Sequence, residues 1–295
     1  MGQNFLKSAI ALRKIVEAGE IKKDDVILEI GPGKGALTEK LLEKMSKGSP
    51  CSKVIAVEKD RGLFEFLKTK FAEQIKSGSL VLVHDDILKF SISNFQFSKY
   101  KIIANIPYNI TGAILKKFLT IENQPVLMVL MVQHEVAQRI MGRQPSFAKA
   151  SEGRGKESLL SISVKAYGEP KMVMKVPARY FSPAPKVDSA VIVIKNISRK
   201  LFDSPLEEYP LGGGGQNSST PSRKRATPQE GNLEKKFWKI VRAGFAHKRK
   251  KLAGNLKNLI QDGSLASVLD LGDKRAENLT LEDWIALTKN SILDS

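Results

Sequence analysis

The segment Asn105-Ile106-Pro107-Tyr108-Asn109-Ile110 carries residue types suited to chemistry on a flat ring that bears an amine. An adenine amine is a poor nucleophile because its lone pair is delocalised, so a catalyst needs oxygen acceptors that hold the N–H groups and free the lone pair. The Asn105 side chain and a backbone carbonyl can supply these oxygens. Tyr108 offers a face for stacking the base, and Pro107 stiffens the turn between them. A buried turn without a ligand is the alternative interpretation.

The reaction expected at this segment depends on orientation more than on acid–base chemistry. The amine becomes acidic only after it has accepted a methyl group, so no nearby histidine is required. Stacking contributes about 1–3 kcal/mol, and each hydrogen bond contributes about 0.5–1.5 kcal/mol net. Most of the rate must therefore come from alignment of an electrophilic methyl group with the nitrogen.

A glycine-rich turn, Gly31-Pro32-Gly33-Lys34-Gly35, lies between a predicted strand and a predicted helix. Glycines allow a tight turn and a close approach of the backbone to a ligand, while the helix N-terminus supplies free N–H groups. The next predicted strand ends in Glu58, 23 residues after Gly35. An acid at such a strand tip can accept hydrogen bonds from ribose hydroxyls. The turn and Glu58 together predict a ligand that contains a nucleoside.

The glycine turn alone leaves the class of ligand open. Residues 31–36 also fit the G-x-G-x-x-A form of a dinucleotide-binding fingerprint, so a dehydrogenase and a methyltransferase are equally compatible with them. A turn with no ligand is a third interpretation. The pair Asp85-Asp86 closes the third predicted strand, where Asp86 could bind an adenine amino group or simply cap a helix.

Apolar, β-branched runs alternate with amphipathic stretches through the first two thirds of the chain, which predicts an α/β fold with a mostly parallel sheet. Two later runs at 172–176 and 190–194 have no helix between them and predict an antiparallel finish to the sheet. The predicted parallel strands are 26–30, 53–58, 80–83, 101–104 and 126–132, and the predicted helices are about 37–45, 63–75, 113–119 and 135–141.

Three regions are expected from the composition of the chain. Residues 1–198 form a catalytic domain that carries a polar loop insertion at about 143–157, and residues 199–232, rich in Gly, Ser, Thr and Pro, form a flexible linker. Residues 233–295 form a small helical domain, with helical periodicity over 234–259 and 264–288. Its candidate inner positions are Trp238, Phe245, Leu252, Leu256 and Leu259.

The charge balance points to a polyanionic partner. The chain has 48 Lys and Arg against 31 Asp and Glu, a net charge of +17, and nucleic acid is the commonest partner of so basic a protein. A generally basic surface is the alternative. One cysteine and three scattered histidines leave no disulfide and no metal-ligand spacing, and no apolar run long enough to span a membrane is present. We therefore expect a cytoplasmic protein with neither a metal nor a membrane partner.

The basic residues are concentrated near the C-terminus. Residues 233–258 contain nine Lys or Arg and one Glu, which is almost half of the excess charge. The run Lys248-Arg249-Lys250-Lys251 is the densest part and is the candidate RNA-phosphate clamp. A solvated face of an amphipathic helix is the alternative interpretation.

Taken together, these motifs resemble the family of small-subunit ribosomal RNA adenine N6,N6-dimethyltransferases. The resemblance implies a Rossmann-like class I methyltransferase sheet with a small all-α C-terminal domain, S-adenosyl-L-methionine as cofactor, and ribosomal RNA of the pre-ribosomal small subunit as partner. The implied product is dimethyladenosine, made during ribosome biogenesis; we expect the enzyme to act as a monomer. The matching blocks are GQNFL at 2–6, EIGPGKGALT at 29–38, VEKD at 57–60, Asp86, NIPYNI at 105–110, QHEVAQRI at 133–140 and FSPAPKVDSAV at 181–191.

The resemblance also implies roles for individual residues. The cofactor would be contacted by Gln3, Asn4 and Leu6 at its methionine part, by Gly31 and Gly33 beside it, by Glu58 at the ribose, by Asp86 at the adenine, and by Asn105. The target base would be positioned by Asn105, Pro107 and Tyr108, with Phe181 on its other face. Phe181 could otherwise belong to the core, but Pro183 and Pro185 predict a stiff loop and favour an exposed position.

The sequence departs from the family pattern at two places, and two other functions remain as alternatives. The family's Arg-Arg-Lys core is replaced by Lys248-Arg249-Lys250-Lys251, which keeps the charge but puts any bidentate arginine contact in doubt. The chain also starts at the GQNFL block, without the short basic arm often seen. One rival is a resistance methylase that acts on large-subunit RNA. The other is an RNA-binding assembly or transcription factor that retains the fold without catalysis.

Overall fold

The computed structural model describes residues 4–45, 53–92, 99–142, 156–203, 230–259 and 273–291. They belong to two compact units: unit 1 is Met1–Glu152 with Ser163–Ser198, and unit 2 is Gly153–Ile162 with Arg199–Ser295. The described residues 156–162, which the sequence assigned to the N-terminal domain, therefore group with unit 2. Contacts within that unit give the reason: the Glu157 amide donates to the Glu277 carbonyl at 2.9 Å, and Lys156 forms an ion pair with Glu277 at 2.6 Å.

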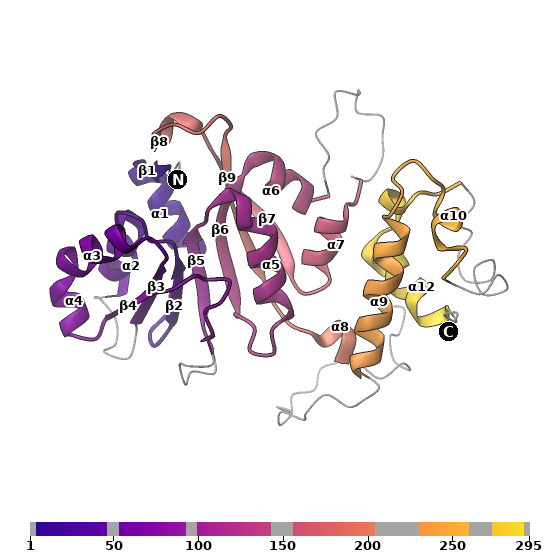
Figure 1. Ribbon diagram of the computed structural model, residues 1–295, viewed down its shortest axis with the longest axis horizontal. Coiled ribbons are helices and arrows are strands. Elements are labelled where there is room, and N and C mark those ends of the chain that lie inside the picture. The colour runs from indigo at the N-terminus through magenta and orange to yellow at the C-terminus, as the bar shows by residue number, and fades with distance from the viewer. Residues whose placement is uncertain are drawn as a thin grey trace. The chain divides into compact units, whose positions relative to one another are not determined.

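Unit 1 is built around a seven-stranded sheet of order β4-β3-β2-β5-β6-β9-β7 (Figure 1). The first five of these strands are parallel, and β9 and β7 are antiparallel, as the sequence predicted. The strands are β2 Val26–Ile30, β3 Lys53–Glu58, β4 Leu80–His84, β5 Lys101–Asn105, β6 Leu127–Gln133, β7 Glu169–Val176 and β9 Ser189–Lys195. A separate two-stranded sheet joins β1 Phe5–Leu6 to β8 Phe181–Ser182.

The helices of unit 1 alternate with the parallel strands. They are α1 Ala9–Ala18, α2 Ala36–Met45, α3 Arg61–Lys70, α4 Ala72–Lys76, α5 Thr111–Thr120 and α6 His134–Ile140, with short 3-10 turns η2 Tyr108–Ile110 and η3 Ala178–Tyr180. Helix α7, Leu159–Lys165, crosses the sequence boundary between the units. Among the described residues, no helix is long and apolar enough to cross a membrane.

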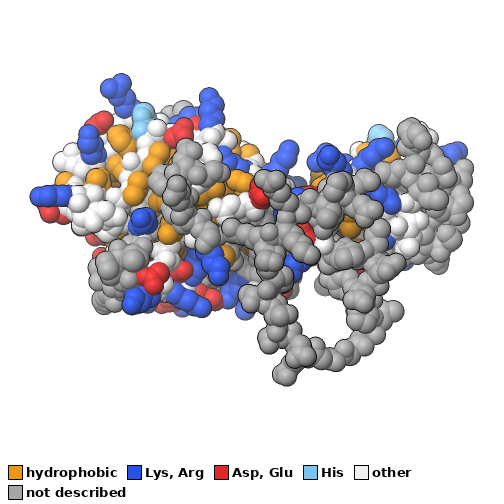
Figure 2. All heavy atoms as spheres, turned by 90° about the horizontal axis from the view of Figure 1, so that it is seen from below, with side chains coloured by type: hydrophobic (Ala, Val, Ile, Leu, Met, Phe, Trp, Pro, Cys, Tyr) orange, Lys and Arg blue, Asp and Glu red, His pale blue; other side chains and the backbone are white. Residues whose placement is uncertain are grey.

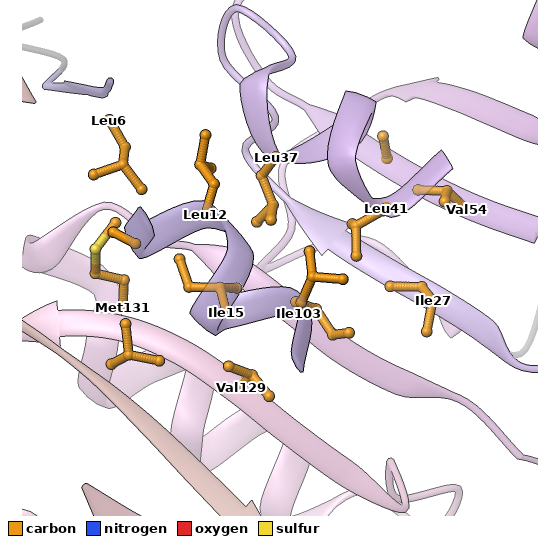
Figure 3. Close-up of a cluster of buried hydrophobic side chains, with 14 of the residues drawn as sticks. Leu6, Leu12, Ile15, Ile27, Leu37, Leu41, Val54, Ile103, Val129 and Met131 are labelled. Carbon is orange, nitrogen blue, oxygen red and sulfur yellow. The ribbon is translucent and has the colours of Figure 1, made fainter. Parts of the chain in front are cut away.

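The core of unit 1 forms where α1 and α2 pack on one face of the sheet. Figure 3 shows Leu12 and Ile15 of α1 and Leu37 and Leu41 of α2 gathered with Ile27, Ile103 and Val129 of the strands. Within β6, Val129 and Met131 belong to this cluster whereas Leu130 between them does not, because successive side chains in a strand point to opposite faces. Packing on both faces explains why these strands are continuous apolar runs.

Two helical features of unit 1 differ from the sequence expectation. Helix α1 was not predicted, although Ser8 caps it by accepting a hydrogen bond from the Ala11 amide at 3.3 Å. The single helix expected over 63–75 is divided into α3 and α4 at Phe71, whose backbone leaves the helical region. Phe71 is buried against Gly35, so tertiary packing overrides the local periodicity.

Unit 2 is helical. Its elements are α8 Lys200–Asp203, α9 Glu230–Gly244, α10 Leu252–Leu256, η4 Ala276–Asn278 and α12 Leu281–Asn290. The core is formed by apolar side chains of α9, α10 and α12, and the ring of Phe202 packs edge-on against Phe237 at 5.4 Å between centroids. Fully buried members are Phe237, Ile240, Val241, Leu252, Leu256, Trp284 and Leu287.

The helix predicted over 234–259 is not continuous. It ends at Gly244 and resumes at Leu252, and residues 245–251 form a turn. The last residue of α9 must be glycine, because a side chain at Gly244 would meet the Trp284 ring at 2.4 Å. Of the five expected inner residues, Leu252 and Leu256 are buried, whereas Trp238, Phe245 and Leu259 are only half-buried.

Two predicted segments lie largely outside the described residues. These are the loop insertion, except for 156–157, and the central part of the linker, 204–229. The ends of the predicted linker are helical: Lys200–Asp203 forms α8, and residues 230–232 begin α9. For the helix predicted over 264–288, residues 264–272 are not described, and α12 begins at Leu281.

Candidate active site

A cavity of about 930 Å³ opens in unit 1 at the carboxyl ends of β2, β3 and β5. Its size suits a nucleoside-containing ligand, and its position is the one where parallel α/β sheets bind ligands. The cavity brings together most of the site residues expected from the sequence. Those that line it are Asn4, Leu6, Gly31, Gly33, Glu58, Asn105, Pro107 and Tyr108.

The glycine turn after β2 has a backbone that only glycine adopts without strain. Gly31, Gly33 and Gly35 have φ values of +64°, +61° and +79°. A side chain at Gly33 would also lie 3.2 Å from the Phe5 ring, a tight contact that adds to the cost of any substitution there. The turn is closed by the Gly35 amide, which donates to the Pro32 carbonyl at 2.9 Å, and α2 begins at once.

Glu58 ends β3 and is 4% exposed. Its Oε2 accepts a hydrogen bond from the Gly33 amide at 3.1 Å, and its Oε1 accepts one from the Asp60 amide at 2.9 Å. A carboxylate has about four acceptor positions, so this side chain can fix the glycine turn and still receive ligand hydroxyls.

Glu29 is a cavity residue to which the sequence reasoning assigned no role. It is 1% exposed, and its Oε2 has no hydrogen-bond partner among the described residues. Burial raises the pKa of Glu29 to about 8, hydrogen bonding to Thr38 opposes the rise, and the charge of Glu58 adds to it. The signal in the sequence was an acid inside an otherwise apolar strand, which ordinarily requires a reason.

Asn105 lies at the end of β5, and Tyr108 lies on the short connection from β5 to α5. Asn105 is the last residue of β5, and Pro107 has an extended backbone that leads into η2. The half-buried Tyr108 places its hydroxyl 2.5 Å from Ser189 Oγ. Burial raises the pKa of Tyr108, and the hydrogen bond to Ser189 acts in the opposite direction. The phenol is therefore neutral at physiological pH.

The N-terminal segment forms one wall of the cavity. Asn4, Phe5, Leu6 and Lys7 line it, and β1 is held by antiparallel pairing with β8, Leu6 opposite Phe181. Lys34 Nζ lies 4.8 Å from the centre of the Phe5 ring. Gln3 lies outside the described residues.

The expected exposure of Phe181 is wrong. Its side chain is 4% exposed, belongs to the hydrophobic core and does not line the cavity. The cause is the pairing of β8 with β1, which draws Phe181 beside the buried Leu6. The stacking role assigned to Phe181 is not supported by this arrangement.

Asp86 also stands apart from the cavity. Its Oδ2 pairs with Lys59 Nζ at 2.8 Å, and its Oδ1 accepts from the Leu88 amide at 3.0 Å. The hydrogen bond from Lys59 lowers the pKa of Asp86. These contacts agree with the interpretation of Asp86 as a capping residue. Asp86 nevertheless lies close to the tip of β3, because the Asp85 amide donates to the Glu58 carbonyl at 3.1 Å and the carboxyl ends of β3 and β4 are adjacent.

The basic run 248–251 lies on the turn between α9 and α10, not on a helix as the sequence suggested. All four side chains are exposed, and Lys251 forms an ion pair with Asp273. Asn255 holds the turn by donating to the Gly244 carbonyl at 2.6 Å. On the face shown in Figure 2, Lys and Arg side chains occur over both units. Within the described residues, no cluster of His, Cys, Asp or Glu could hold a metal ion.

Comparison with known proteins identifies the family. The family described as ribosomal RNA adenine dimethylase matches residues 1–209. Proteins named ribosomal RNA small subunit methyltransferase A from Dehalococcoides mccartyi and Crocosphaera subtropica are each 36% identical, over 96% and 97% of this chain and 84% and 95% of their own.

Two solved structures share the fold. The 23S rRNA methyltransferase ErmE is 22% identical with a TM-score of 0.68, over 97% of this chain and 99% of its own. A dimethyladenosine transferase from Plasmodium falciparum is 24% identical with a TM-score of 0.66, over 96% and 95%. The fold is thus the class I methyltransferase fold expected from the sequence, and the chain belongs to the ribosomal RNA adenine dimethylase family.

Proposed function

We propose that this enzyme transfers methyl groups from S-adenosylmethionine to the N6 amine of adenines in small-subunit ribosomal RNA and produces dimethyladenosine during ribosome biogenesis. One observation carries the proposal: a single cavity is lined by Gly31 and Gly33 of the glycine turn, by the acid Glu58, and by Asn105 and Tyr108. A donor and an acceptor base could therefore meet there.

The cavity residues fit the proposed cofactor. Glu58 retains acceptor capacity for ribose hydroxyls after its two backbone hydrogen bonds. Gly31 leaves room for close approach of a ligand to the backbone. Asn4 and Leu6 line the same cavity and would contact the methionine moiety. We keep Gln3 and Asp86 as proposed contacts, Asp86 because it follows β4 beside Glu58. When bound, the cofactor supplies an electrophilic methyl on a sulfonium.

The acceptor side of the site orients the base. Asn105 presents an amide oxygen at the tip of β5, and the rigid Pro107 turn places Tyr108 nearby. The oxygen accepts an N–H of the amine, which directs the nitrogen lone pair towards the methyl group, while the ring of Tyr108 supports the base. A general base is not needed, because the proton leaves only after the methyl has been accepted.

Dimethylation requires the same site to accept its own first product. The monomethylated amine has one N–H left, which Asn105 can still hold, and the cavity volume of about 930 Å³ leaves room for the added methyl. In the second transfer, the orientation of the base therefore depends more on stacking against Tyr108 than it does in the first.

Unit 2 contributes RNA affinity in this proposal. Its turn at 248–251 exposes four cationic side chains to phosphates, although Lys251 shares its charge with Asp273. Residues 1–198 would be the catalytic domain and 233–295 the RNA-binding domain. We further propose that the enzyme acts as a monomer in the cytoplasm, on the RNA of a forming small subunit.

The rival functions can be separated in one assay. Purified small and large ribosomal subunits that lack the modification are incubated with the enzyme and methyl-labelled S-adenosylmethionine, and the RNA is digested for mass analysis. Label in dimethyladenosine from the small subunit is the expected result. Label only in the large subunit would support a resistance methylase, and RNA binding without any label would support a non-catalytic RNA-binding factor.

A further inference from the structure

Tyr108 is joined to a distant part of the sheet by one hydrogen bond. Its hydroxyl lies 2.5 Å from the hydroxyl of Ser189, 81 residues further along the chain. Ser189 begins β9, where it lies opposite Gln133 at the end of β6 and Val176 at the end of β7. The bond therefore links the turn after β5, which carries Tyr108, to the place where β9 pairs with β6 and β7.

Ser189 is unusual in its own strand. It is 0% exposed, and the five residues that follow it, Ala190–Ile194, are all apolar and buried. A buried hydroxyl is costly without a partner. Among the described residues, Tyr108 is the partner of the Ser189 side chain. Packing alone would be satisfied by alanine here, so the hydroxyl requires a separate explanation.

We propose that Ser189 is a positioning residue whose hydroxyl fixes the Tyr108 ring so that one face stays turned to the acceptor base. The proposal rests on the proposed function, since it concerns the second part of the same site. With its hydroxyl bonded inside the protein, Tyr108 meets the base through its ring and not through a hydrogen bond. Burial keeps the phenol neutral by raising its pKa, which lets it serve as either donor or acceptor to Ser189.

The two methyl transfers should depend unequally on this bond. In the first, two N–H groups and the stacked ring orient the amine; in the second, one N–H group is left. A ring that is free to tilt therefore impairs the second transfer more than the first. Loss of the Ser189 hydroxyl should show as accumulation of monomethyladenosine, which a general loss of stability would not produce.

The test compares four variants of the full chain: Ser189→Ala, Ser189→Cys, Tyr108→Phe, and Ser189→Ala with Tyr108→Phe. Each removes or weakens the same bond, and Cys keeps a hydrogen-bonding group at the γ position, although it is a weaker donor and slightly larger than Ser. We expect each single variant to lower the dimethylation rate by about tenfold, as befits one hydrogen bond, and the double variant to be no slower than the slower single variant. The ratio of monomethyl to dimethyl product should rise in all four, while the Kd for S-adenosylmethionine stays within about twofold.

Ser161→Ala is the matched control, because Ser161 is equally buried and its hydroxyl bonds within unit 2, to the Ser158 carbonyl at 2.8 Å. It should leave the product ratio unchanged. If Ser189→Ala fails to fold, Tyr108→Phe still tests the bond from the other side. Wild-type product ratios in Ser189→Cys and Tyr108→Phe, or additive losses in the double variant, would overturn the proposal. A wild-type enzyme that methylates no ribosomal RNA would instead refute the proposed function.

Discussion

The Gly33 amide donates a hydrogen bond to Glu58 Oε2 over 3.1 Å, which links the glycine turn after β2 to the tip of β3. The same carboxylate accepts from the Asp60 amide through its other oxygen. One buried acid therefore sets the shape of the turn and presents negative charge to the cavity. Loss of this side chain should weaken the binding of the methyl donor more than the binding of RNA.

The first prediction concerns Glu58→Ala, with Glu58→Gln as the milder change. Because hydrogen bonds to a charged group contribute about 1.5–3 kcal/mol, Glu58→Ala should raise the Kd for S-adenosylmethionine by at least about tenfold, measured by calorimetry. Glu58→Gln should fall between the wild type and Ala. The exposed Glu65→Gln on α3 is the control. An unchanged Kd in Glu58→Ala would show that Glu58 does not hold the cofactor.

The second prediction concerns two glycine substitutions that should change the free energy of unfolding in opposite directions. Gly35 has φ +79°, and an added Cβ would lie 2.5 Å from the Phe71 ring, so Gly35→Ala should lower the free energy of unfolding by about 1–3 kcal/mol. Gly112 lies within helix α5 with nothing within 4 Å of an added Cβ, so Gly112→Ala should raise it by about 0.5–1 kcal/mol. Urea unfolding measures both. Equal effects would contradict the packing described around Gly35.

The third prediction concerns Glu29 and pH. Its folded pKa of about 8 lies above the unfolded value of 4.5, mainly because of burial. The folded state therefore holds the proton more tightly, so this contribution to stability is complete below pH 4.5 and is lost as the pH rises through 8.

Glu29→Gln mimics the protonated acid and lacks this loss. Between pH 5 and pH 8 the variant should gain stability over the wild type, at no more than about 1.4 kcal/mol per pH unit, and above pH 8 the difference should level off. Urea unfolding of both proteins across this range is the measurement. Parallel curves would mean that Glu29 titrates normally.

The fourth prediction concerns the exposed turn of unit 2. Replacing Lys248, Arg249 and Lys250 by glutamine should weaken binding to small-subunit RNA and reduce the salt slope by about two to three. The control is a triple glutamine variant at the exposed residues Lys22, Lys23 and Lys99, which precede the amino ends of β2 and β5, at the edge of the sheet away from the cavity. Equal slopes in the two variants would rule out a specific role for the turn.

The sheet was predictable from sequence because its signal is local. Each parallel strand is an apolar run bounded by polar residues, and β2 matches its predicted bounds of 26–30. The site followed from the same pattern, since Glu58 and Asn105 each end a parallel strand and parallel strands end at one edge of the sheet. Asn105, Tyr108 and Glu58 therefore line one cavity although they lie far apart in the chain.

What could not be predicted depends on contacts between distant segments. Phe181 is buried because a two-residue strand pairs with β1, and two residues are too few for a periodic signal. The bond between Tyr108 and Ser189 spans 81 residues and has no local signature. The need for glycine at position 244 depends on the ring of Trp284, whose position no property of the 234–259 segment reveals.

The most direct test of the account is the transfer of labelled methyl groups from S-adenosylmethionine to purified small ribosomal subunits by the wild type and by Asn105→Ala. Asn105 is the only acceptor side chain assigned to the target amine. We expect dimethyladenosine with the wild type and a loss of at least about a hundredfold in Asn105→Ala, with RNA affinity changed by less than about twofold. Methylation of the same adenines at an undiminished rate in Asn105→Ala would contradict the claim that the tip of β5 aligns the amine with the methyl group.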